Sequence, residues 1–214
     1  SDPPIFLPIL WRRLQSPAVD YGNSPDCRCF AQWRKWRCQN TLSSVEMPAA
    51  KVQLVVCDVD GTLTDGVIGI NDRGEEFKNF SVADGMGLRL LMDAGIEVAF
   101  LSGRHCPAVD HRARGLGIRI CQTGVTRKKE HLEDLIKGQG LEPSQVCYIG
   151  DDVNDLSCLR IVGFPVAVAN AHVEVRKLAE YVTTVPGGSG AVREVAEMVL
   201  EARGLLGSVL EKFS

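Results

Sequence analysis

The feature that most limits the fold of this chain is a regular alternation of short apolar runs with amphipathic stretches, which begins near residue 51. The first run, VQLVVC at residues 52–57, is apolar throughout, as expected for a parallel strand buried on both faces. Strands that alternate with helices of about ten residues predict an α/β fold, with right-handed crossovers around one parallel sheet. The further strands are expected at residues 97–102, 118–121, 145–150, 165–169 and 181–184, and helices at 107–115, 127–137, 153–161, 172–179 and 190–203.

One segment departs from this alternation and predicts a β-hairpin. Residues 67–70 (VIGI) and 75–82 (EEFKNFSV) have strand character, and the turn sequence NDRG joins them. Asp84 is predicted to cap the helix that follows, which ends at Gly95. About 18 residues separate Asp65 from Asp84, too few for a second folded domain at this position. We therefore expect a Rossmann-like parallel sheet with a β-hairpin flap.

Residues 1–46 differ from the rest of the chain and are predicted to be an N-terminal extension to a domain at residues 47–214. The extension carries a charge of +2 from six basic and four acidic residues, and neither the helical nor the strand period is sustained in it. Its stretch RCFAQWRKWRC mixes aromatic with cationic side chains, as nucleic-acid contacts do. A disordered leader, or an artefact upstream of a start at Met47, is the favoured interpretation.

Composition excludes several classes of protein. The 214 residues are 45% hydrophobic and 24% charged, an ordinary globular mixture. The net charge of −3 gives no indication of nucleic acid or an anionic membrane as partner. No apolar run approaches the roughly 20 residues of a membrane span, and the stretch PIFLPILW is too short for a secretory core. We expect a cytoplasmic protein with neither nucleic acid nor membrane as partner.

Charged and polar residues gather where strands end. In open α/β sheets, ligands bind beyond the carboxyl ends of the strands, where the connections diverge. One acid pair at one strand end often marks only a turn with a helix cap. Acids at two strand ends, with a hydroxyl and a lysine between them, favour a common site. The residues concerned are Asp58 and Asp60, Ser102-Gly103-Arg104, Thr126-Arg127-Lys128-Lys129 and the GDDVND stretch at 150–155.

This set of residue types suits phosphoryl transfer. A carboxylate can attack phosphorus and hold it as an acyl phosphate. Because the carboxylate and the phosphoryl group are both anionic, a hard divalent cation must neutralise them, and Mg²⁺ prefers oxygen ligands. Lysine and hydroxyl groups hold the remaining phosphoryl oxygens. A second acid, kept protonated beside the first, can protonate the leaving oxygen and then accept a proton from water.

The motifs DVDGTLTDG (58–66), LSGR (101–104), a lysine before a helix and GDDVND (150–155) resemble those of the haloacid dehalogenase-like phosphohydrolases. The stretch from DGVIGI to LSGR, together with VPGGSGAVREV near the end, is similar to the 3-deoxy-D-manno-octulosonate 8-phosphate phosphatases. The resemblance covers roughly residues 51–203. It implies a haloacid dehalogenase-like fold with the flap in place of a cap domain. It also implies a magnesium-dependent phosphatase of lipopolysaccharide biosynthesis, which releases the sugar acid and phosphate through an aspartyl-phosphate.

The resemblance also implies roles for individual residues. Asp58 is the implied nucleophile and a metal ligand, and Asp60 is the implied general acid and base, whose backbone carbonyl also binds the metal. Asp151 is the implied distal metal ligand, oriented by Asp152 and Asp155. A guanidinium beside the phosphate site can bind a carboxylate through two hydrogen bonds. The remaining implied contacts are Ser102, Gly103 and Lys128 to phosphate, and Arg104 and Gly66 to the substrate.

Two positions leave alternatives open. Lys129 competes with Lys128 for the phosphate, because this sequence has two adjacent lysines. Ala83 stands where the family usually has arginine, so a nine-carbon ulosonate 9-phosphate or another small sugar phosphate is an alternative substrate. A non-catalytic assembly domain is a third hypothesis. It is disfavoured because the nucleophile, the general acid, the lysine and the metal-binding acid are all present.

The resemblance further implies a homotetramer. In the resembled family, the hairpins of four chains form a barrel, and the tail of one chain closes the site of its neighbour. The stretch Gly187-Gly188-Ser189-Gly190 and the nearby Arg193 suit that closing role, since glycines permit close approach of the backbone. The same glycines are also typical of a simple loop before a helix.

Overall fold

The structure is a computed structural model that describes residues 42–213. The expectations for residues 1–41, including their nucleic-acid or leader role, lie outside the described residues, as does Ser214. The described chain begins with α3 (Leu42–Ala49), a helix that runs across the expected boundary between residues 46 and 47. Val45 of this helix is buried in the core of the domain.

The domain is built on one parallel sheet of six strands. Its strand order is β5-β4-β1-β6-β7-β8, and every neighbouring pair is parallel. The sequence prediction of a Rossmann-like parallel sheet is therefore confirmed. The strands are β1 (Leu54–Cys57), β4 (Glu97–Leu101), β5 (Ile120–Gln122), β6 (Val146–Gly150), β7 (Phe164–Ala167) and β8 (Tyr181–Val182).

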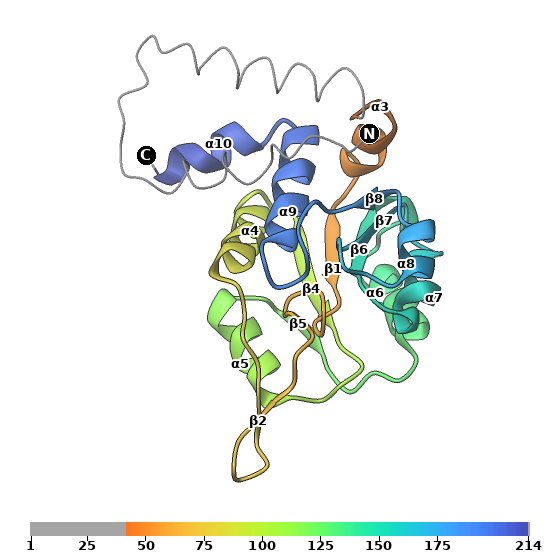
Figure 1. Cartoon of the computed structure of the whole chain (residues 1–214). Coiled ribbons are helices and arrows are strands. Elements are labelled where there is room, and N and C mark those ends of the chain that lie inside the picture. Colours follow the sequence, from red (N-terminus) through yellow and green to blue (C-terminus); the bar gives the residue numbers. More distant parts are fainter. Residues whose placement is uncertain (1–41, 214) are drawn as a thin grey trace, which may run out of the picture. The chain divides into compact units, whose positions relative to one another are not determined.

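Helices cover both faces of the sheet. Figure 1 shows α4, α5 and α9 on one side of the strands and α6, α7 and α8 on the other. The helices are α4 (Val82–Asp93), α5 (Pro107–Leu116), α6 (Lys128–Gly138), α7 (Leu156–Leu159), α8 (Val173–Leu178), α9 (Ala191–Ala202) and α10 (Leu206–Leu210), with 3₁₀ turns at Pro143–Gln145, Val153–Asp155 and Glu211–Phe213. Within the described chain, no helix has both the length and the apolarity that a bilayer crossing needs.

Strand β1 lies at the centre of the sheet and is buried along its whole length. It pairs with β4 on one side and with β6 on the other. The chain runs from β1 outward through β4 to β5, and then returns to β6 on the opposite side of β1. The connections from the carboxyl ends of β1 and β6 therefore diverge at a topological switch point, where this class of sheet binds its ligands.

The predicted flap is present as a short hairpin. Its strands are only β2 (Gly69–Ile70) and β3 (Glu76–Phe77), and they pair antiparallel. The side chain of Asn71 accepts hydrogen bonds from the backbone N–H groups of residues 73 and 75, which closes the turn. In Figure 1 the hairpin projects at the bottom of the view. We use the name flap for residues 67–82.

Three local expectations differ from the structure. Ser81, rather than Asp84, caps helix α4, because its hydroxyl accepts the N–H of Asp84 at 3.3 Å. The predicted helix at 153–161 is a 3₁₀ turn followed by the single α-turn of α7, and the last strand ends at Val182. Because Ser81 occupies the cap position, the side chain of Asp84 is available for contacts with another helix.

Helix α4 packs closely against α9, and two residues explain the contact. The carboxylate of Asp84 accepts hydrogen bonds from the backbone N–H groups of Gly190 (3.2 Å) and Arg193 (2.9 Å) at the start of α9. Burial raises the pKa of Asp84, and these backbone donors act in the opposite direction. One turn further along α4, a Cβ on Gly87 would lie 2.8 Å from the Cα of Arg193, so only glycine allows the helices this separation.

We expect Gly87→Ala to destabilise the domain although it adds a better helix former. The new methyl group meets backbone rather than a movable side chain, and overpacking of this kind costs about 1–3 kcal/mol. Gly115→Ala in α5 is the matched control, because a Cβ there meets nothing within 4 Å. Its free energy of unfolding should rise by up to about 1 kcal/mol. Urea denaturation of both variants measures the difference, and equal stabilities would contradict the close-packing argument.

Candidate active site

A pocket of about 250 Å³ opens at the carboxyl ends of β1, β4 and β6. It joins residues that lie up to 96 positions apart in the sequence, since Asp58 and Asn154 both line it. Seven of the eight lining residues have roles implied by the resemblance, and the eighth, Asn154, belongs to the GDDVND stretch. The lining residues are Asp58, Asp60, Gly66, Gly103, Arg104, Asp151, Asp152 and Asn154.

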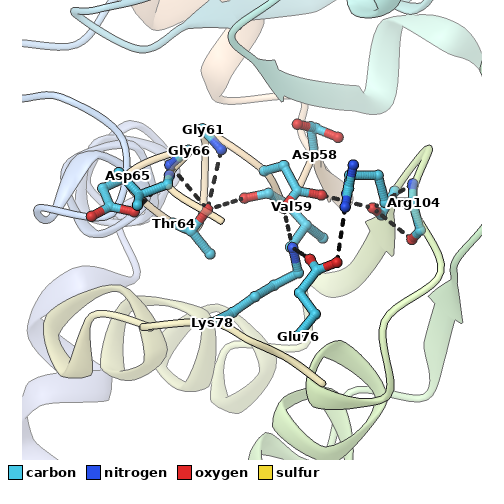
Figure 2. A network of polar contacts seen from close by, with 12 residues as sticks. Asp58, Val59, Gly61, Thr64, Asp65, Gly66, Glu76, Lys78 and Arg104 are labelled. Carbon is cyan, nitrogen blue, oxygen red and sulfur yellow. Dashed lines mark hydrogen bonds and ion pairs between the residues drawn. The ribbon is translucent and has the colours of Figure 1, made fainter. Parts of the chain in front are cut away.

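The turn that follows β1, residues 58–66, carries the first two carboxylates, and Thr64 holds it together. Figure 2 shows the hydroxyl of Thr64 at the centre of the turn. It accepts hydrogen bonds from the N–H groups of Gly61 (3.2 Å) and Gly66 (3.3 Å), and donates one to the carbonyl of Val59 (3.3 Å). We call residues 58–66 the β1 turn. A buried side chain that bonds three backbone groups fixes where the acids point.

Three carboxylates converge at the inner end of the pocket. Oxygen atoms of Asp58, Asp151 and Asp155 all lie within 4.8 Å of one another. The expectation that Asp58 and Asp151 meet in space is therefore confirmed. Oδ1 of Asp151 is buried and has no hydrogen-bond partner among the described residues. A buried carboxylate oxygen without a partner, next to a second carboxylate, fits the ligand set of a hard divalent cation.

Gly61 makes this convergence possible. A Cβ at this position would lie 2.0 Å from Oδ2 of Asp151, so any other residue would push that carboxylate away. Gly61 also has φ +91°, which side chains disfavour. The glycine that follows the two acids in the sequence is thus required both by the turn and by the approach of the strand β6 loop.

Lys128 compensates the charge of this cluster. Its ammonium group donates to Oδ1 of Asp58 at 2.5 Å and to Oδ1 of Asp155 at 2.7 Å, and its side chain is only 3% exposed. Burial alone would lower the pKa of Lys128, but the two carboxylates outweigh it and raise that pKa. Lys129, the alternative left open by the sequence, is half exposed and lies 3.6 Å from Glu133 on the outer face of α6.

Asp155 has a different environment from the other two acids. Its Oδ1 accepts from Lys128 and from the buried hydroxyl of Tyr148 (2.7 Å), and its Oδ2 accepts from the N–H groups of Asp151 (3.0 Å) and Asp152 (3.4 Å). Both of its oxygens are therefore occupied by donors from the protein. This arrangement orients Lys128 and the start of the Asp151 loop, and it leaves Asp58 and Asp151 as the acids available to a cation.

In the absence of a cation, burial and mutual repulsion raise the free energy of the ionised acids. Burial and the neighbouring charge of Asp155 raise the pKa of Asp58 well above its usual range, while Lys128 opposes this shift. Burial and Asp155 likewise raise the pKa of Asp151 to about 6. Like charges that crowd a dry site favour either protonation or a bound cation.

The carboxylate of Asp60 points to a different set of partners. It forms an ion pair with Lys78 from the flap and accepts a hydrogen bond from the hydroxyl of Ser102 at 3.3 Å. Lys78 also pairs with Glu76 at 2.7 Å, and Glu76 in turn pairs with Arg104 at 2.8 Å, as Figure 2 shows. Ion pairs therefore connect the flap to the β1 turn and to the loop after β4.

Sequence reasoning did not find Lys78 and Tyr148. The side chain of Lys78 is only 1% exposed, although lysine in a short hairpin is ordinarily a surface residue. Tyr148 is fully buried within the apolar run of β6, where its position indicates a core residue. The strand period places residues 76 and 78 on the same side of the flap, which was the available signal for Lys78.

The remaining predicted residues lie as follows. Ser102 is buried, and its hydroxyl also bonds the backbone of Arg104. Gly103 and Gly66 line the pocket without side chains, and Gly66 has φ +80°. Arg104 is half exposed at the pocket rim. Ala83 is exposed in the first turn of α4 and is not among the pocket-lining residues.

A Rossmann-like sheet that presents two acids from its central strand, an acid pair from the next strand and a buried lysine defines a haloacid dehalogenase-like phosphohydrolase. The sequence profile of the haloacid dehalogenase-like hydrolases matches residues 118–194. The chain belongs to this family and, within it, to the 3-deoxy-D-manno-octulosonate 8-phosphate phosphatases, as the following relatives establish. It is accordingly a phosphoric monoester hydrolase.

Two curated relatives and one solved structure illustrate the similarity. The 3-deoxy-D-manno-octulosonate 8-phosphate phosphatase KdsC of Yersinia pestis is 43% identical over 155 residues, which cover 72% of this chain and 83% of the relative. The KdsC of Haemophilus influenzae is 42% identical over 153 residues, covering 72% and 85%. The Moraxella catarrhalis phosphatase, solved with a magnesium ion, a phosphate ion and a KDO molecule, superposes with a TM-score of 0.79 at 40% identity, covering 81% of this chain and 99% of that one.

We expect Lys128→Met to destabilise the fold strongly and Lys129→Met to leave it nearly unchanged. Removing the ammonium group strands two buried carboxylates, a change that typically costs about 3–5 kcal/mol. The exposed pair of Lys129 with Glu133 is worth only about 0.5 kcal/mol. Urea denaturation in EDTA compares the two variants without a contribution from bound metal. Equal losses of stability would show that Lys128 does not compensate the carboxylates.

Proposed function

We propose that the protein hydrolyses 3-deoxy-D-manno-octulosonate 8-phosphate to the free sugar acid and phosphate, through an aspartyl-phosphate on Asp58. The observation that carries the proposal is the position of Asp58. It is buried at the end of the central strand, is hydrogen-bonded by Lys128, and lies beside Asp151 in the open pocket. The Yersinia and Haemophilus relatives, which bear the name of this activity, support the choice of substrate.

We assign Mg²⁺ to the site, held by the carboxylates of Asp58 and Asp151 and, as the resemblance implies, by the backbone carbonyl of Asp60. The free oxygen of Asp151 and the 4.8 Å convergence of the acids support the assignment. The magnesium ion in the Moraxella structure also supports it. When bound, the metal supplies positive charge that offsets the repulsion between the nucleophile and the phosphoryl group.

The first half of the reaction forms a bond from an oxygen of Asp58 to phosphorus and breaks the bond from phosphorus to the sugar oxygen. The leaving oxygen takes a proton from Asp60, which lies two residues along the same turn. Lys128 and the hydroxyl of Ser102 donate hydrogen bonds to phosphoryl oxygens and share the charge of the transition state. Each of these groups belongs to a buried or backbone-bonded segment, so little reorganisation is needed.

The second half of the reaction releases phosphate. Asp60, now ionised, accepts a proton from a water molecule, whose oxygen attacks phosphorus. The bond from phosphorus to Asp58 breaks, and the carboxylate of Asp58 is restored. The ammonium group of Lys78 pairs with the carboxylate of Asp60 and holds this side chain in position for the transfer.

Arg104 and Gly66 are the residues we assign to the sugar acid. The guanidinium of Arg104 lies at the pocket rim and is half exposed, so it can exchange Glu76 for the substrate carboxylate. Gly66 lets the substrate approach the backbone of the β1 turn. Ala83 offers no charge to the sugar, and for this reason a nine-carbon ulosonate 9-phosphate is the second candidate substrate. No specific observation favours a non-catalytic assembly role.

We also propose that the protein forms a homotetramer through the flap. Several large apolar side chains of the flap are exposed, including Ile70 (65%) and Phe77 (52%). A cluster of this kind on a projecting hairpin is typical of an interaction surface. The flap is too short to cover the pocket as a folded domain would, and assembly with other copies gives it a hydrophobic partner. The exposed apolar residues are Val67, Ile68, Ile70, Phe77 and Val82.

The wild-type protein with Mg²⁺ should release inorganic phosphate from 3-deoxy-D-manno-octulosonate 8-phosphate, and EDTA should stop the reaction until Mg²⁺ is restored. Asp58→Asn should lower kcat by at least about 10⁴-fold, because an amide cannot attack phosphorus. Its fold should persist, since Lys128 keeps its pair with Asp155. Phosphate release and circular dichroism measure the two effects. Turnover by Asp58→Asn near the wild-type rate would exclude the covalent mechanism.

A panel of substrates decides between the candidate sugars. The panel contains the eight-carbon and nine-carbon ulosonate phosphates together with simple hexose phosphates, scored by kcat/KM. A preference of about 100-fold or more for the eight-carbon substrate supports the proposal, since hydrogen-bonding sites commonly discriminate by at least this factor. A flat profile would reject the narrow assignment and leave a general sugar phosphatase.

Ile70→Lys should convert the tetramer to smaller species. Each buried isoleucine contributes about 1.5–3 kcal/mol, and a lysine in its place adds a charge that an apolar interface cannot solvate. Met47→Lys is the control, because Met47 is similarly exposed (67%) but lies on α3, outside the flap. Sedimentation velocity compares both variants with the wild type. A monomeric wild type, or an unchanged tetramer in Ile70→Lys, would contradict the flap interface.

A further inference from the structure

The loop between β8 and α9 lies against the β1 turn of the same chain. The last four residues of this loop, Gly187-Gly188-Ser189-Gly190, are called the brace below. We propose that the brace is a positioning element of the reaction, which holds the β1 turn so that Asp58 and Asp60 face the substrate phosphate. The proposal rests on the function proposed above. It assigns these glycines a role within one chain, in addition to any role they have toward a neighbouring subunit.

The contact between the brace and the β1 turn is made by backbone atoms. The N–H of Gly188 donates to the carbonyl of Thr62 at 3.0 Å. A Cβ on Gly187 would lie 1.8 Å from the carbonyl oxygen of Gly61, and a Cβ on Gly188 would lie 2.5 Å from the carbonyl carbon of Thr64. The atoms they meet are backbone, which cannot swing aside as a side chain can. The β1 turn therefore keeps its position only while the brace has no side chains at these two places.

The brace is itself anchored at both ends. At its start, the side-chain oxygen of Asn170 accepts the N–H of Gly187 at 2.9 Å. At its end, Asp84 accepts the N–H groups of Gly190 and Arg193, and Asp84 is almost completely buried. A loop that is fixed at two ends and touches the turn in its middle transmits the rigidity of α4 and α9 to the site.

Rigidity of the β1 turn matters because it carries both reacting acids. Within the turn, the N–H groups of residues 62, 63 and 64 donate to the carbonyl of Val59. The hydroxyl of Thr64 adds three bonds of 3.2–3.3 Å, to Val59, Gly61 and Gly66. The brace supplies further contacts to this turn, at the backbone of residues 61–65. Covalent attack requires the carboxylate oxygen within about 3–3.5 Å of phosphorus and in line with the leaving oxygen, and a shift of about 1 Å can cost about 100-fold in rate.

The test is a pair of matched substitutions, Gly188→Ala and Gly204→Ala. Both glycines have φ +68°, so alanine brings the same backbone strain to each. Only at Gly188 does the new methyl group meet the β1 turn, because a Cβ at Gly204 meets nothing within 4 Å. We expect Gly188→Ala to lower kcat for phosphate release by about 10-fold or more with a much smaller change in KM. Gly204→Ala should keep the wild-type kcat.

A second readout does not depend on turnover. Hydrogen exchange of the backbone amides in residues 59–66 should accelerate by about 10-fold or more in Gly188→Ala and stay at the wild-type rate in Gly204→Ala. The measurement is made on the full chain without substrate. If the wild type fails to hydrolyse the eight-carbon substrate, the proposed function is lost, but the exchange rates still decide the role of the brace.

Asn170→Ala provides a milder variant in case Gly188→Ala does not fold. Asn170 is exposed, so its loss removes one anchor of the brace without opening the core. We expect faster exchange in residues 59–66 and a fall of about threefold or more in kcat, because the brace loses one anchoring hydrogen bond. Unchanged exchange and unchanged kcat in whichever of the two variants folds would overturn the proposal.

Discussion

The structure depends on the interaction of buried carboxylates with one lysine at the carboxyl ends of β1 and β6. Asp58, Asp151 and Asp155 converge within 4.8 Å, and the protein itself places one buried cation, Lys128, among them. One ammonium group does not balance three carboxylates, so burial and repulsion keep the pKa of Asp58 raised. This unbalanced charge is the physical basis for metal dependence. A divalent cation beside Asp58 favours the ionised form of this carboxylate, which is the form that our proposed mechanism requires.

Close approach of backbone segments is the second requirement of the site. Gly61 makes room for the carboxylate of Asp151, and Gly187 makes room for the β1 turn. Gly150 makes room for Asp155, because a Cβ at position 150 would lie 2.5 Å from Oδ2 of Asp155. In each case the space a side chain would fill is taken by a reacting group or by the segment that supports one. These glycines therefore permit dense packing around the candidate site, and Gly61 in addition permits the turn conformation.

The sequence predicted the sheet well because strands buried on both faces must be apolar throughout, and β1 and β6 are. The meeting of Asp58 with Asp151 followed from the rule that strand ends share one edge of a sheet. The resemblance implied Lys128 but left Lys129 open, since neighbouring helical residues point about 100° apart. The structure buries Lys128 beside Asp58 and leaves Lys129 half exposed. The contacts of Asp84 and Lys78 were missed because both depend on segments distant in sequence.

In our proposals, the flap connects subunit assembly with the candidate site. Residues 76 and 78 lie on one side of the flap, where Glu76 and Lys78 connect Arg104 with Asp60. Phe77 lies between them in sequence and is exposed on the other side, in the surface we assign to other copies of the chain. A contact that buries Phe77 would restrain Glu76, its neighbour in β3, and Lys78, the next residue along the chain. Under the assembly we propose, pairing of the flap with another flap orders Lys78 over Asp60, and subunit contacts take the place of a cap domain.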